Sequence, residues 1–101
     1  MDIETLEELL LGNTGLLISL RMGDGVQQVK VSQIIEVIDH LSEEWAESES
    51  IPKKAANLFV DLYAAAYSTL GLYSEEEMIR IEDAVDKIMD SVRKCWSDKT
   101  V

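Results

Sequence analysis

One histidine stands among carboxylates in the middle of the chain. Glu36, His40 and Glu44 follow one another at four-residue steps, so on a helix they share a face and offer two or three metal ligands. A carboxylate-bridged metal centre, however, needs ligands that project into a bundle core from several helices. Here the acids lie opposite the apolar residues of their own segment. The sequence therefore predicts a solvated acidic face, with no metal and no cofactor.

The other reactive residue types lack the partners that catalysis needs. Cys95 is the only cysteine, and it falls on an apolar helical stripe, which is typical of an inert core thiol. Asp24 lies between two glycines, but the Lys-Ser/Thr pair of a phosphate loop and the ligand series of a calcium loop are missing. We therefore predict that the chain is not an enzyme.

The charge of the chain is strongly one-sided. Twenty Asp and Glu face nine Lys and Arg, which gives a formal net charge of −11. Such a surface repels nucleic-acid phosphates and anionic lipid headgroups, and it attracts basic protein surfaces. The alternative is that the acidity serves solubility alone.

The acidity is densest between Gln33 and Ser50, where the sequence contains no Lys or Arg. Ser32 is predicted to cap a helix that runs to about Glu47, because apolar residues recur there at steps of three and four. The outer face of this helix carries the predicted partner-binding residues, which are Glu36, Asp39, His40, Glu43, Glu44 and Glu47.

The next predicted helix begins near Pro52 and runs to about Leu70, with Gly71 after its end. It is apolar on two sides, so either neighbouring helices surround it or it lies between subunits. The residues predicted for such an oligomer interface are Leu58, Phe59, Leu62, Tyr63 and Tyr67. Trp96 is a further aromatic residue of the kind that anchors interfaces.

Three more segments complete the prediction. Asp2 is expected to cap a helix over residues 3–11, and Ser74 to begin a final helix that ends near Trp96. For residues 16–31 we favour a β-hairpin around Asp24-Gly25, although a helix over residues 14–22 also fits.

Together these features predict a mainly α-helical fold, a small antiparallel bundle of about four helices. It forms a single domain over residues 1–101, in which 96–101 is a frayed tail. The N-terminus lacks a basic secretory segment, which indicates a cytoplasmic protein. Direct contact with a membrane or nucleic acid is not expected.

The predicted function is that of a small acidic protein that docks a basic protein or peptide. Inhibitors, immunity proteins and anti-defence proteins share this size and charge, which is an analogy without a shared motif. The alternative is a homo-oligomer, in the simplest case a homodimer, with a structural or small-ligand-binding role.

Overall fold

The computed structural model describes residues 2–96, and its first helix begins at the predicted cap. Helix α1 spans Ile3–Leu11, and the Asp2 carboxylate accepts a hydrogen bond from the Thr5 backbone N–H at 2.9 Å. This bond satisfies one of the free N–H groups at the helix start. Leu6 and Leu10 are completely buried on the inner side of the helix.

The β-hairpin predicted for residues 16–31 is wrong. The segment contains helix α2, Leu16–Arg21, and the first turn of helix α3, Gln28–Glu44. The alternative of a helix over residues 14–22 is therefore the correct one. Leu16, Leu17 and Leu20 are all buried, and only a helix can turn three residues at this spacing to the same side.

Helix α3 is also displaced from its predicted bounds. It begins at Gln28, four residues before the predicted cap at Ser32, and it ends at Glu44. Val31 and Ile34 are both buried, so the helical apolar pattern starts before the serine. Ser32 lies exposed within the helix. The apolar contact with the rest of the bundle outweighs the local capping preference of the serine.

The second half of the chain follows the prediction closely. Helix α4 spans Lys53–Ser68 directly after Pro52, and a short 3-10 turn, η1, covers Leu70–Leu72. Helix α5 spans Glu75–Lys94, and the Ser74 hydroxyl accepts a hydrogen bond from the Glu77 N–H at 3.3 Å. The predicted frayed segment, 96–101, lies outside the described residues except for Trp96.

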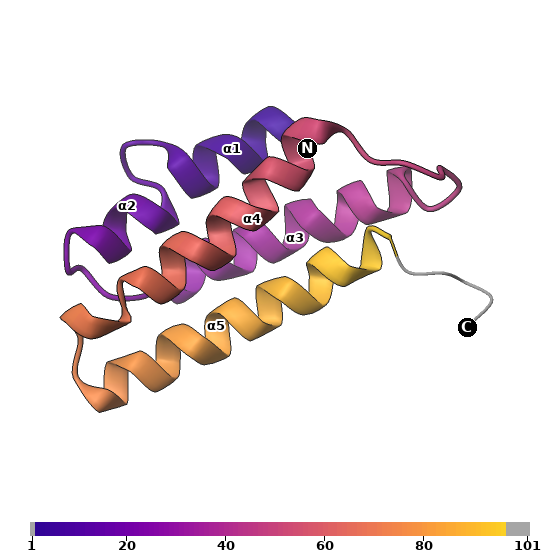
Figure 1. Cartoon of the computed structure of the whole chain (residues 1–101). Coiled ribbons are helices and arrows are strands. Elements are labelled where there is room, and N and C mark those ends of the chain that lie inside the picture. Colours follow the sequence, from indigo (N-terminus) through magenta and orange to yellow (C-terminus); the bar gives the residue numbers. More distant parts are fainter. Residues whose placement is uncertain (1, 97–101) are drawn as a thin grey trace.

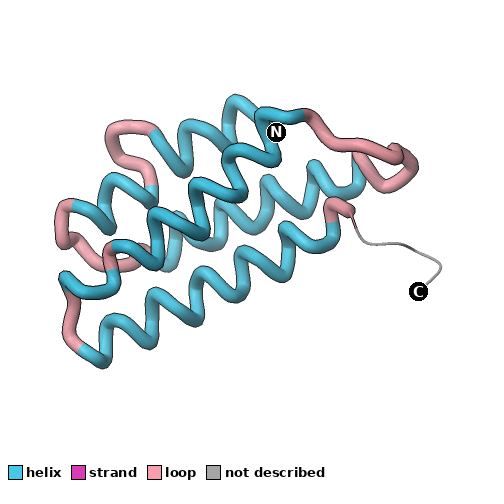
Figure 2. The backbone as a smooth tube through the Cα atoms, viewed as in Figure 1, coloured by secondary structure: helices cyan, strands magenta, loops and turns pink. Residues whose placement is uncertain are grey.

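The helices form a four-cornered bundle in which α1 and α2 together occupy one corner (Figure 1). Helix α1 packs on α3 and α4, α2 packs on α4, and α5 packs on α3 and α4 from the other side. Consequently α3 and α4 stand at opposite corners. Helices α3 and α5 run in the same direction, and α4 runs against both. The mainly helical bundle is thus confirmed, and Figure 2 shows no strand in the described part of the chain.

A single apolar core fills the space between these helices. Its largest completely enclosed side chains come from all five α-helices, and α4 contributes one of them, Leu62. They are Leu6, Leu10, Leu16, Leu20, Ile34, Ile38, Leu62, Ile81, Val85, Ile88 and Val92. The carboxylates of α3 lie on the side of the helix that faces away from this core. The sequence predicted this, because the acids stand opposite the apolar residues of the same segment.

A polar clamp joins the start of α5 to the loop between α2 and α3. The Tyr73 hydroxyl donates to the Leu20 carbonyl at 2.6 Å and accepts from the Gly25 N–H at 3.1 Å. The Glu77 carboxylate accepts from the Val26 N–H at 3.1 Å. Ser74 and Glu77 have the spacing of a capping box, in which the glutamate would accept from the Ser74 N–H, but the Glu77 side chain binds this distant loop.

Gly25 is expected to tolerate substitution less well than its near neighbour Gly23. Both have positive φ angles, 78° and 81°, so alanine at either position is strained by about 1 kcal/mol. A Cβ on Gly25 would also lie 2.9 Å from the Glu77 carboxylate, whereas open space surrounds Gly23. Urea denaturation should show Gly25→Ala to be less stable than Gly23→Ala by about a further 1 kcal/mol, the value of a displaced hydrogen bond. Equal losses would contradict the clamp.

Candidate functional site

The acidic face predicted for residues 33–50 lies along the outside of α3 and the loop that follows it. Glu36, His40, Glu43 and Glu44 are exposed on the helix, and Glu47 is exposed just beyond its end. Asp39 is half-buried at the edge facing α5. The structure thus brings the six predicted partner-binding residues onto one side of the bundle.

Contacts between side chains modify the charge of this face. Lys94 of α5 lies 3.2 Å from the Asp39 carboxylate, so one of the acids has a cationic partner from another helix. His40 lies 3.6 Å from Glu44. The acidic face is therefore partly neutralised at Asp39. Such partly exposed pairs are weak, and most of the negative charge of the face is retained.

Metal ligands do not gather on this face. Within residues 2–96, no three His, Cys, Asp or Glu side chains stand close enough together to hold an ion. Glu36 lies one turn before His40 on the exposed side of α3 and completes no such group. The face therefore presents carboxylate charge and hydrogen-bond acceptors along the outer side of α3.

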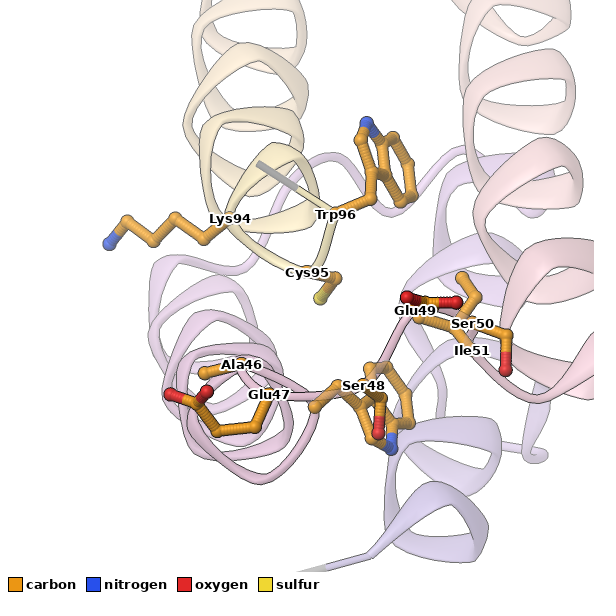
Figure 3. A pocket seen from close by; sticks show the side chains of 10 residues that line it. Ala46, Glu47, Ser48, Glu49, Ser50, Ile51, Lys94, Cys95 and Trp96 are labelled. Carbon is orange, nitrogen blue, oxygen red and sulfur yellow. The ribbon is translucent and has the colours of Figure 1, made fainter. Parts of the chain in front are cut away.

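A cleft of about 950 Å³ opens at the end of the bundle, between the α3–α4 loop and the end of α5 (Figure 3). Ser48, Glu49 and Ser50 line one side, and Cys95 points toward them from the other. Lys94 extends away from the cleft. The cleft thus brings serine hydroxyls and a carboxylate together with one thiol.

The Cys95 thiol is poorly suited to nucleophilic chemistry. It is buried, and it lies 3.9 Å from the Ser91 carbonyl, toward which it donates. Burial, and to a smaller extent the charge of Asp39, raise the pKa of Cys95 to about 11. The reactive thiolate is therefore scarce at neutral pH. These properties are those of a core residue.

The residues predicted for an oligomer interface on α4 divide into two groups. Leu58, Phe59 and Leu62 are buried inside a single chain, so their side chains are already covered. Tyr63 is 51% exposed, and its ring lies 4.7 Å from that of the half-buried Tyr67. Of the five predicted interface residues, the two tyrosines are thus the ones that another molecule can reach.

This accessible side of α4 forms an apolar groove with α5. The groove has a volume of about 390 Å³, and its lining is entirely apolar in character. Phe59 forms its floor, where it contacts the ring of Trp96 with centroids 6.0 Å apart. The full lining is Ala56, Phe59, Val60, Tyr63, Ala64, Met89 and Trp96.

The sequence prediction omitted most of these groove residues. Ala56, Val60 and Ala64 recur at four-residue steps, so the signal of a second apolar side was present on α4. Met89 could not be assigned to the same surface, because its place depends on how α5 packs against α4.

Comparison of the chain with protein-family models, with curated proteins and with solved structures gave no match. The described helices include none that is long and apolar enough to cross a membrane.

Proposed function

We propose that this chain is a small acidic binding protein, without catalytic activity of its own, that docks a basic protein surface in the cytoplasm. Inhibitors, immunity proteins and anti-defence proteins act in this general manner. The observation that carries the proposal is the exposed side of α3, on which Glu36, Glu43 and Glu44 stand together. No Lys or Arg interrupts the sequence from residue 33 to residue 50.

The charge of the whole chain supports the same partner class. A formal net charge of −11 attracts a cationic surface over a distance of about one Debye length, roughly 8 Å at physiological salt. The carboxylates on α3 then determine the orientation of docking, because they present acceptors to Arg and Lys side chains. Binding of this kind should weaken as salt is raised.

The scaffold is suited to presenting such a face. Ile34, Ile38 and Leu41 on the inner side of α3 are buried against the rest of the bundle. The exposed acids therefore stand on a helix whose backbone is already fixed, so a partner has to order only their side chains.

Charge reversal on α3 tests the proposal. In the variant Glu36→Lys, Glu43→Lys and Glu44→Lys, recovery of a partner captured from the native host should fall about tenfold or more. Reversal of three exposed charges weakens each contact by an amount on the order of 1 kcal/mol. Lysines near the C-terminal end of α3 interact favourably with the negative end of the helix dipole, so the variant should keep its fold.

A matched variant controls for net charge. Glu8→Lys, Asp61→Lys and Asp83→Lys reverse three exposed acids on α1, α4 and α5, so both triple variants carry the same net charge. Quantitative mass spectrometry of the captured proteins should show that this variant retains the partner. If the α3 variant kept the partner, or if both variants lost it equally, docking through α3 would be refuted.

A further inference from the structure

The exposed stripe of α4 has a symmetric order of residues. Lys53, Ala56, Val60, Ala64 and Tyr67 follow one another at steps of three, four, four and three, so they share one side of the helix. The spacing is the same in both directions from Val60, which is 67% exposed. Two such stripes laid antiparallel would place Val60 against Val60, and Ala56 against Ala64.

The side chains of this stripe suit close contact between helices. Ala56 and Ala64 are small, and both line the apolar groove together with Val60. Trp96, which is 55% exposed, borders the groove from the α5 side. The groove thus offers an exposed apolar surface against which a second copy can pack.

The charges at the two ends of the stripe are complementary. Lys53 stands at the first residue of α4, and Asp86 and Glu82 of α5 lie near Tyr67 at the other end. Tyr67 and Glu82 both line a small hollow between α4 and α5, and Asp86 follows Glu82 one helical turn later on the same side of α5. In an antiparallel pair, Lys53 of each chain therefore approaches the acidic end of the other.

Helix α4 also minimises the repulsion between two acidic chains. It carries Lys53, Lys54 and Asp61, whereas α1, α3 and α5 each contain more acids than bases. A contact through α4 keeps the acidic side of α3 at the opposite corner of each bundle. The net charge of −11 thus opposes a contact through α4 less than a contact through α1, α3 or α5.

We infer that two copies of this chain form a two-fold symmetric homodimer through α4, with Val60 on the symmetry axis and Lys53 facing Asp86 of the other copy. Such an isologous contact is the commonest kind in homodimers. With 16 residues, α4 is about 24 Å long, so the contact is smaller than the standard of roughly 800 Å² per partner. We expect a dissociation constant on the order of micromolar or weaker. The inference is independent of docking through α3.

Cysteine cross-linking tests the symmetry axis directly. A residue on a two-fold axis lies next to its own copy, so Val60→Cys should form a disulfide-linked dimer under mild oxidation. Val29→Cys on α3, where Val29 is 74% exposed, is the matched control and should remain monomeric on a non-reducing gel. The native Cys95 is buried and should not react. Equal cross-linking of the two variants would refute the axis.

Sedimentation across about 1 μM to 1 mM, at roughly 0.15 M salt, tests the association itself. Val60→Glu should weaken the dimer at least tenfold, while Val29→Glu leaves it unchanged. Asp86→Lys should also weaken it, and adding Lys53→Glu to that variant should restore it, because the facing charges are then exchanged. A wild-type chain that stays monomeric throughout, or a charge exchange that restores nothing, would overturn the inference. A wild-type chain that stays monomeric would assign the groove to a different protein. Neither of these results affects the test of docking through α3.

Discussion

Replacing Leu62 with alanine is expected to lower the free energy of unfolding by about 2–5 kcal/mol. Leu62 is completely buried, with 0% exposure, at the centre of the bundle. The truncation removes apolar contacts from several neighbouring helices and leaves a cavity that the packed core can fill only in part. Urea denaturation at about 0.1 μM protein, below the expected dimer range, measures the loss for a single chain.

The matched control lies two residues away on the same helix. Val60→Ala shortens a side chain that is 67% exposed, so the free energy of unfolding should change by less than about 0.5 kcal/mol. The pair of variants separates the core side of α4 from its accessible side. If Val60→Ala proved as damaging as Leu62→Ala at low concentration, α4 would pack in a different rotation from the one described.

Replacing Glu77 with alanine should cost about 1–3 kcal/mol, because the partly buried N–H of Val26 loses its acceptor. The same change removes the contact with Arg80, whose guanidinium lies 3.0 Å from the carboxylate. Glu76→Ala is the control, since this exposed acid occupies the same first turn of α5. It should cost only the few tenths of a kcal/mol that an acid near the helix start contributes.

The contribution of Glu77 should also depend on pH. The hydrogen bond from the Val26 N–H, and then that from Arg80, hold the pKa of Glu77 below its ordinary value of 4.5. A lowered pKa in the folded state means that the stabilisation is complete above pH 4.5 and is lost as pH falls through the lower value. The stability difference between wild type and Glu77→Ala should therefore narrow in acid. A gap that widened below pH 4.5 would contradict this assignment.

The helical pattern of the second half of the chain was predictable because its signals are local. Ser74 lies three residues before Glu77 and does cap α5, and Pro52 directly precedes α4. The outward direction of Glu36 and Glu44 followed from the spacing of the apolar residues on the same helix. These features depend on neighbours within one or two turns, which the order of residues specifies directly.

The region around residues 16–31 was not predictable by the same means. Its apolar runs are short, and short runs fit a strand or a helix equally well. The helices there are stabilised by contacts distant in sequence, such as those from Tyr73 to Leu20 and from Glu77 to Val26. The two residues of each contact lie about fifty positions apart in the sequence, so no local pattern predicts the contact.

The residues of this chain by themselves determined its helical class, its charge and the acidic outer side of α3. Only the tertiary structure decided which apolar side of α4 became core and which remained open, and that Lys94 reaches Asp39. The physical reason is that a helix specifies its own faces, whereas burial depends on where the other helices pack. Leu62 and Val60 differ little in their local sequence, and their different surroundings come from the position of α5 and the rest of the bundle.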